Sequence, residues 1–168
     1  MHKQTNLAKR FGRAHWVGQV WRLVSVLHGR RLLNALKLLS SYYLSRLFGK
    51  PIMRGLPISL SIEPTTHCNL RCPHCPSGLR SFTRPTGMLD MHLFRRIIDE
   101  VHETLMYLML YFQGEPYLHP GFTELVRYAR KRNIYTAAST NGHYLNPQNA
   151  EKTVRAGLDK LIVSIDGL

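Results

Sequence analysis

The order of apolar and polar residues from position 58 onward predicts strands that alternate with helices. Residues 58–63 alternate apolar and polar side chains, as a half-buried strand does, and in the longer stretches apolar residues recur every three to four positions. Asp90 and Asn146 are typical N-cap residues, and Gly157 is a typical helix-ending residue. We therefore predict strands over residues 58–63, 105–112, 134–139 and 158–165, and helices over residues 91–104, 120–132 and 147–155.

The short connections between these elements indicate an α/β fold with parallel strands and right-handed crossovers. In barrels of this kind the active site lies at the carboxyl ends of the strands. Each predicted strand is followed at once by a polar or cysteine-containing stretch, namely residues 68–75, 113–116, 139–142 and 164–167. We expect these four stretches to meet at one edge of the sheet.

Two further helices are predicted before residue 50. The helical period of residues 32–48 is carried by Leu32, Leu36, Leu39, Tyr43 and Leu47. Residues 14–27 form a second apolar-rich stretch, which contains Trp16 and Trp21. Neither stretch reaches the roughly 18–20 uninterrupted apolar residues that a membrane-spanning helix needs. Neither is followed by a signal-peptide cleavage site of small residues.

The positive charge of the chain, formally +13, is concentrated in this N-terminal part. Residues 1–62 contain eleven Lys and Arg and no Asp or Glu, whereas residues 63–168 contain twelve basic and ten acidic residues. We predict a basic amphipathic helical segment over residues 1–50, a linker over residues 51–57 and a catalytic domain over residues 58–168.

Two interpretations of the N-terminal segment stay open. Basic amphipathic helices lie on anionic membrane surfaces or bind partners. Alternatively, the segment is a helical cap that packs its apolar stripe on the barrel and leaves its charges solvated, since apolar stripes are usually core. Nucleic acid binding is not favoured, because the segment shows no interleaving of aromatic and basic residues and no DNA-binding motif.

Composition limits the class of protein. A chain of 168 residues can form one domain with a core, and 44% hydrophobic residues exclude a disordered chain. All three cysteines lie within eight residues, whereas a secreted domain would have dispersed, even-numbered cysteines. The sequence therefore predicts a reducing compartment, the cytoplasm, with attachment at the membrane surface if the N-terminal segment binds lipid.

The three cysteines, Cys68, Cys72 and Cys75, follow the spacing Cys-x3-Cys-x2-Cys and indicate one coordination site. Three thiolates can hold an iron–sulfur cluster and leave one iron open for chemistry. A closed Cys3His zinc site that includes His67 or His74 is the alternative. A structural disulfide is not favoured, because three cysteines cannot all pair with one another.

Residues 62–75, with the sequence IEPTTHCNLRCPHC, resemble the signature of the radical S-adenosylmethionine (radical SAM) superfamily, most closely its SPASM or twitch-type branch. The resemblance implies a partial (βα)6 barrel in which Cys68, Cys72 and Cys75 bind a 4Fe–4S cluster. The open iron of that cluster would bind S-adenosylmethionine, whose reductive cleavage yields a 5′-deoxyadenosyl radical. His74 stands where the family often has an aromatic residue near the adenine.

Other positions are assigned by the same resemblance. Residues 113–116, with the sequence QGEP, resemble the family's Gly-Gly-Glu-Pro, with Gln113 in place of the first glycine. Gly114 permits close approach of the backbone to a ligand, and Glu115 can accept hydrogen bonds from the amino group of S-adenosylmethionine. The alternative is an ordinary strand-to-helix turn with a solvated glutamate.

The ends of the third and fourth strands also resemble the family. Ser139, Thr140 and Asn141 correspond to the polar strand end that contacts the methionine part or the ribose, although Asn-Gly alone is a turn signal. Ser164 and Asp166 correspond to the ribose contact and lie on one face of the strand by alternation. A helix cap or turn at Asp166 is the alternative.

The resemblance covers about the first four strand–helix units of the barrel, so we expect a chain that is incomplete at its C-terminus. It implies an electron donor of the reduced flavodoxin or ferredoxin type. The substrate would be a peptide, a protein or a small metabolite. The competing function is a non-catalytic zinc- or cluster-binding module whose N-terminal helices bind a partner.

Overall fold

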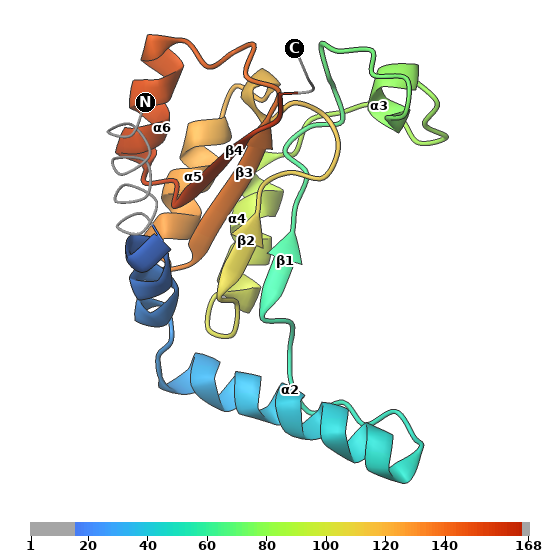
Figure 1. Cartoon of the computed structure of the whole chain (residues 1–168), viewed down its shortest axis with the longest axis vertical. Coiled ribbons are helices and arrows are strands. Elements are labelled where there is room, and N and C mark those ends of the chain that lie inside the picture. The colour runs from blue at the N-terminus through green and yellow to red at the C-terminus, as the bar shows by residue number, and fades with distance from the viewer. Residues whose placement is uncertain (1–15, 166–168) are drawn as a thin grey trace, which may run out of the picture.

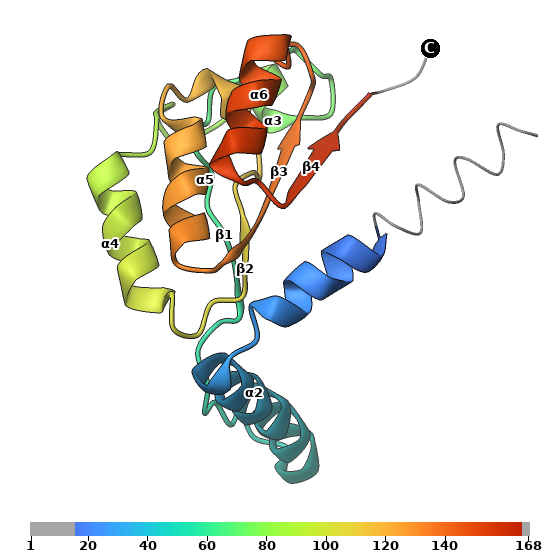
Figure 2. The same cartoon turned by 90° about the vertical axis from the view of Figure 1, so that its left-hand side faces the viewer.

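The computed structural model describes residues 16–165 and shows a four-stranded parallel sheet. Strand order follows the sequence, β1-β2-β3-β4, and each strand pairs in parallel with the next. The strands are β1 (Ser59–Ser61), β2 (Tyr107–Met109), β3 (Tyr135–Thr140) and β4 (Lys160–Val163). Helices α4, α5 and α6 cover one face of this sheet (Figures 1 and 2). The predicted α/β fold with a partial parallel barrel is confirmed.

The three crossover helices begin and end close to their predicted positions. They are α4 (Met91–Val101), α5 (Phe122–Lys131) and α6 (Pro147–Ala156). Asp90 caps α4 by accepting from Leu93 N at 2.9 Å, and Asn146 caps α6 by accepting from Asn149 N at 2.8 Å. Gly157 ends α6 with φ at 82°, the left-handed region that favours glycine.

Strands β1, β2 and β4 are shorter than predicted. The chain leaves the ladder after Ile62 because Pro64 has no N–H to donate. Before β2, Leu105 donates to the carbonyl of Val101 at 2.8 Å and so lies in the turn after α4, not in the sheet. Two short elements, α3 (Pro76–Leu79) and the 3-10 helix η1 (Pro116–Leu118), lie where neither a helix nor a strand is predicted, since so few residues give no period.

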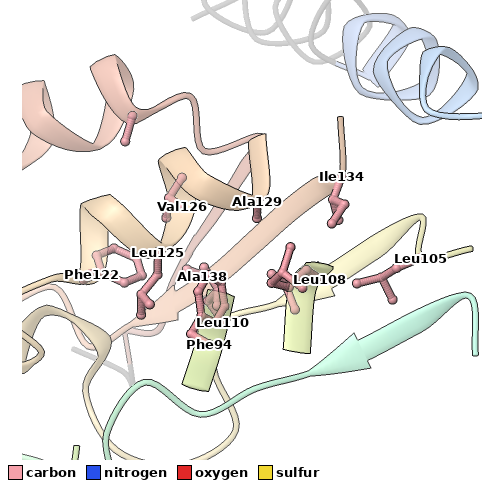
Figure 3. Packing of buried hydrophobic residues seen from close by; sticks show 12 residues of the cluster. Phe94, Leu105, Leu108, Leu110, Phe122, Leu125, Val126, Ala129, Ile134 and Ala138 are labelled. Atoms are coloured by element: carbon pink, nitrogen blue, oxygen red, sulfur yellow. The ribbon is translucent and has the colours of Figure 1, made fainter. Parts of the chain in front are cut away.

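The hydrophobic core lies between the sheet and the inner faces of these helices (Figure 3). Helix α4 contributes Phe94 and Ile98, and α5 contributes Leu125 and Val126. Leu108 of β2 is fully buried in the same cluster. The carboxyl ends of the strands, and the loops that follow them, are therefore carried by a packed scaffold.

The N-terminal helices lie at the opposite end of the sheet. Residues 16–25 are helical, and α2 spans Gly29–Phe48. Both views place α2 beyond the amino ends of the strands, away from the loop that carries α3 (Figures 1 and 2). Among the described residues, no helix is long and apolar enough to span a membrane.

Helix α2 docks through polar side chains. Arg31, Asn34 and Ser41 are its buried residues. The Arg31 guanidinium donates five hydrogen bonds to backbone carbonyls, two of them to His102 O at the end of α4 and one to Arg132 O at the end of α5. The predicted apolar stripe faces solvent instead. The interpretation in which that stripe packs on the barrel is therefore wrong, because polar groups that bond backbone carbonyls and amides occupy the buried face.

Candidate cofactor site

The parallel register brings three of the four polar stretches, and the described part of the fourth, to one edge of the sheet. Ser61 of β1 is in register with Met109 of β2, which is in register with Ala137 of β3. The cysteine loop follows β1, the turn at Glu115 follows β2, and Asn141 follows β3. The described part of the fourth stretch, Ser164 and Ile165, follows β4 at the same edge.

Helix α3 packs against the cysteine loop at one glycine, Gly78. Cys68, Cys72 and Cys75 are free and partly buried. Cys75 donates its N–H to Cys72 O at 3.2 Å and is the N-cap residue of α3. A Cβ on Gly78 would lie 2.5 Å from Cys72 N and 2.7 Å from Cys72 O. The backbone of α3 therefore packs directly against the loop, and only glycine fits there.

Two N–H groups point at the first cysteine sulfur. Leu70 N donates to Cys68 Sγ at 3.5 Å, and Asn141 Nδ2 lies 3.9 Å from the same sulfur. N–H donors of this kind can also hydrogen-bond to a cysteine sulfur that binds an iron–sulfur cluster. Three thiols on one loop with N–H donors to sulfur fit an iron–sulfur cluster by the chemistry of the donors. Within residues 16–165, no group of three or more His, Cys, Asp or Glu side chains is placed to hold a single metal ion.

Glu115 is a buried carboxylate that ties three segments together. Its side chain is 1% exposed. Oε1 accepts from Thr140 Oγ1 at 2.7 Å and from Tyr117 N at 3.2 Å, and Oε2 accepts from Asn141 N at 2.8 Å. Its own N–H donates to His67 O at 2.7 Å, next to the first cysteine. Glu115 thus connects the ends of β2 and β3 to the cysteine loop.

The alternative of a solvated glutamate in an ordinary turn is therefore wrong. Each carboxylate oxygen can accept two hydrogen bonds, and among the described residues Oε2 accepts one. Glu115 can still accept from a ligand while it holds the loops. Binding of S-adenosylmethionine by Glu115 stays a prediction, and the structure adds a supporting role that the sequence interpretation did not include.

Gly114 must be glycine at this turn. Its φ is +76°, and a Cβ there would lie 2.1 Å from Thr65 O. Its N–H donates to Ser77 Oγ at 3.2 Å, which brings the α3 segment against the turn. The close approach predicted for Gly114 is thus an approach to the cysteine loop of the same chain. An approach to the ligand stays a prediction.

Asn141 connects Glu115 to the cysteine loop. Besides the contact with Cys68, its Nδ2 donates to Asn69 Oδ1 at 2.9 Å. Its Oδ1 accepts from His143 N at 3.0 Å, and Gly142 has φ at 82°, so the turn signal of Asn-Gly is also real. The structure therefore brings Cys68, Glu115 and Asn141 together through side-chain and backbone hydrogen bonds.

The remaining predicted positions are placed less tightly. Ser139 Oγ of β3 and Ser164 Oγ, just after β4, lie 3.3 Å apart, so the two hydroxyls are on the same face of the sheet. His74 is exposed on the cysteine loop. Asp166 lies outside the described residues, and the pairing proposed for it with Ser164 stays a prediction.

Sequence reasoning missed three supporting residues. Ser77 is buried and positions Gly114, and Glu63 Oε1 accepts from Gln113 N at 3.0 Å. The Gln113 Oε1 atom is buried and, among residues 16–165, has no hydrogen-bond partner. The family departure at Gln113 thus leaves an unused acceptor next to the Glu115 turn. No local pattern reveals these roles, since each depends on burial or on a partner at least 37 positions away.

A hollow of about 320 Å³ lies on one side of the cysteine loop. It is lined by Thr66, His67, Cys68, Ser77, Arg80 and Arg84 among others. Of the predicted site residues, only Cys68 borders it. The hollow therefore borders the cysteine loop, and one of its two arginines, Arg84, is paired with Glu63 at 2.7 Å.

Comparison with known proteins identifies relatives for the part of the chain that carries this site. The family model described as the radical SAM superfamily matches residues 62–168, and the resemblance seen at residues 62–75 is confirmed. The AdoMet-dependent heme synthase of Methanosarcina barkeri is 35% identical over 115 residues, which are 68% of this chain and 33% of that protein. The PqqA peptide cyclase of Gluconobacter oxydans is 33% identical over 108 residues, or 64% and 30%. The chain thus matches about a third of the length of these relatives.

A solved structure shows the same fold. BtrN in complex with AdoMet and 2-DOIA superposes with a TM-score of 0.59 at 23% identity, covering 69% of this chain and 49% of that one. At this identity the likeness shows the fold alone.

Proposed function

The chain belongs to the radical S-adenosylmethionine superfamily, and from this membership we propose that it is a radical enzyme acting on a peptide, a protein or a small metabolite. The family's cofactors are a 4Fe–4S cluster and S-adenosylmethionine. When bound, they supply one-electron cleavage of the sulfonium, and the protein supplies orientation and exclusion of water. A non-catalytic zinc module is not favoured, because the family match covers residues 62–168, which include the cysteine loop and the strands β2 to β4.

One observation carries the proposal: Asn141 joins the carboxylate of Glu115 to the sulfur of Cys68. Cys68, Cys72 and Cys75 would hold the cluster. The free capacity of Glu115 Oε2 would accept from the ammonium of S-adenosylmethionine. Because one hydrogen-bonded network fixes both groups, the ligand would be oriented relative to the cluster before it binds.

The polar ends of β3 and β4 would orient the rest of S-adenosylmethionine. Ser139 and Ser164 present two hydroxyls on one face, which suits hydrogen bonding to the ribose or to the methionine part. His74, on the exposed part of the loop, would stack on the adenine. Asp166 would accept from a ribose hydroxyl together with Ser164.

A peptide is the substrate class that we favour. One relative is a peptide cyclase, and the matched stretch is the part that the two proteins share. Because another relative is a heme synthase, a small molecule is the second candidate for the substrate class. Substrate-binding residues lie mainly in loops rather than in the shared scaffold, so competition between a peptide and a small metabolite for the reconstituted protein would decide between them.

We propose a reduced flavodoxin or ferredoxin as electron donor and a cytoplasmic location with attachment to an anionic membrane surface. The exposed Arg80 lines the hollow beside Cys68, so an acidic donor can approach the cluster from that side. The eleven basic residues of positions 1–62, with no acidic residue among them, favour an anionic surface.

Anaerobic reconstitution tests the cofactor assignment. We expect a brown protein that absorbs near about 400 nm and contains four irons, as thiolate-bound clusters do. Cys72→Ala should lose the cluster, because two thiolates do not hold a cluster with an open iron. Ser81→Ala, an exposed substitution just after α3, is the matched control and should keep it. A colourless protein with one zinc, or a Cys72→Ala protein with full iron content, would overturn the proposal.

A further inference from the structure

Helix α2 turns its apolar stripe to solvent. We call the residues of this face the outer stripe: Leu32, Leu36, Leu39, Tyr43 and Leu47. Their exposed fractions rise from 49% at Leu32 to 75% at Leu47. Their spacing of three to four residues places them along one side of the helix for about four turns. An apolar face of this length on a folded protein marks an interaction surface.

The outer stripe cannot roll inward, because polar contacts fix the opposite face. Asn34 Oδ1 accepts from Leu56 N and its Nδ2 donates to Leu56 O, both at 2.8 Å. Ser41 Oγ accepts from Arg54 N at 3.0 Å. Arg31 is fully buried and uses all five of its N–H donors on carbonyls. Rotation of α2 would leave these groups unsatisfied at a high cost.

The preceding helix repeats the arrangement. Arg22 pairs with Asp159 at 2.9 Å and donates to Asn133 Oδ1 at 2.7 Å, so this helix also docks by a polar contact. Trp16 and Trp21, the two tryptophans of the protein, are 66% and 75% exposed. Tryptophan is enriched where a protein meets the membrane interface, because its ring is amphipathic.

Charge identifies the partner of this surface. Lys37, Arg46 and Lys50 are exposed on or next to α2, and residues 1–62 contain no carboxylate side chain. A groove of about 490 Å³ at the start of α2 combines basic and apolar side chains, with Arg30, Lys37, Arg54, Leu33, Met53 and Leu56 among its lining residues. A second copy of the same face would bring like charges together, whereas an anionic lipid headgroup would neutralise them.

We propose that the outer stripe and the two exposed tryptophans are the lipid-contacting face, which lies in the headgroup region of an anionic membrane with Lys37, Arg46 and Lys50 at its phosphates. This inference names the residues that make the proposed membrane contact, and it rests on the membrane attachment given under the proposed function. Because α2 lies at the end of the sheet opposite the cysteine loop, the cofactor site then faces away from the bilayer (Figure 1).

Lipid binding can be measured on the whole chain without any cofactor. We expect a blue shift of tryptophan fluorescence and co-flotation with vesicles made of equal parts phosphatidylcholine and phosphatidylserine. Phosphatidylcholine vesicles should bind much less, and added salt should weaken binding to the anionic vesicles. Failure here leaves the cofactor chemistry standing, and a protein that loses its cluster should still bind vesicles, so the two proposals fail separately.

Variants at exposed positions locate the face without disturbing the fold. The triple change Leu36→Ser, Leu39→Ser and Tyr43→Ser should weaken vesicle binding at least about tenfold, since it removes three apolar contacts. Val154→Ser on α6, a position that is 78% exposed, is the control and should bind normally. Lys37→Gln should weaken binding about fivefold, and Lys152→Gln, a charge at the other side of the fold, should leave it unchanged.

Three results would overturn the proposal. They are an unshifted tryptophan spectrum with anionic vesicles, equal binding of the triple variant and the unmodified chain, and a stable dimer that the triple variant converts to monomer. The last would assign the outer stripe to self-association. Far-ultraviolet circular dichroism of each variant would show that the helices are retained.

Discussion

The substitution Glu115→Gln separates the supporting role of this residue from its proposed role in ligand binding. The carboxylate accepts hydrogen bonds from Thr140 Oγ1, Tyr117 N and Asn141 N at 2.7, 3.2 and 2.8 Å. An amide of the same shape has one oxygen and one NH2 group. Whichever way it is oriented, its NH2 group faces at least one N–H donor, from Tyr117 or from Asn141.

The cost follows from these contacts. One hydrogen bond to a charged acceptor is lost in a site where Glu115 is 1% exposed, and such bonds contribute about 1.5–3 kcal/mol each. We expect the free energy of unfolding to fall by about that amount. If Oε2 also accepts from the ammonium of S-adenosylmethionine, affinity for this ligand should fall by a further one to two powers of ten, or about 1.5–3 kcal/mol.

Two measurements read the two roles independently. Urea unfolding of the cluster-free protein gives the stability change, and titration of the reconstituted cluster with S-adenosylmethionine, followed by electron paramagnetic resonance, gives the affinity. Glu124→Gln, at an exposed carboxylate paired with Arg95, is the matched control and should change neither. Lower stability with unchanged affinity would make Glu115 purely structural, and no change in either would refute the hydrogen-bond network itself.

Two further substitutions test a backbone turn and a buried side chain at opposite ends of the sheet. Gly114→Ala should lower the free energy of unfolding in urea by at least about 2 kcal/mol, because φ is +76° and a Cβ would lie 2.1 Å from Thr65 O. Gly87→Ala, where an added Cβ meets nothing within 4 Å, is the control and should be nearly neutral. Equal effects of the two substitutions would contradict this geometry. Arg31→Met should lower the free energy of unfolding by about 3 kcal/mol, because five buried donors disappear and the carbonyls that accept from them lose a partner. Arg30→Met, at a side chain that is 70% exposed, is the control and should lower it by about 0.5 kcal/mol or less. Similar values for both variants in thermal or urea unfolding would show that Arg31 is not a buried anchor.

The barrel part of the fold could be predicted from local sequence because its signals are local. Asp90 and Asn146 cap the helices that their residue types indicate, and the alternation of strands and helices requires parallel pairing. The spacing of Cys68, Cys72 and Cys75 likewise needs only eight residues to be recognised. Parallel pairing then places the ends of consecutive strands at one edge, so Glu115 and Asn141 could be assigned to the site in advance.

Features that depend on distant partners could not be predicted. Burial of Glu115 follows from Thr140 and Asn141, which arrive from the next strand, and no pattern near residue 115 indicates it. The docking of α2 depends on Arg31, whose acceptors at His102 and Arg132 lie 71 and 101 positions away. Periodicity identifies an apolar face, but it does not say whether that face meets the core, a partner or a membrane.

The buried Arg31 explains why α2 can expose an apolar face at all. Burial lowers the pKa of its guanidinium, yet all five donors have acceptors. Two of these acceptors, His102 O and Arg132 O, terminate α4 and α5, where the helix dipoles present partial negative charge. A cation is therefore favourable at this junction, and docking of α2 needs no contribution from the leucines of the outer stripe. The same contact that attaches α2 to the core leaves the outer stripe available, at the end of the sheet opposite the cofactor site.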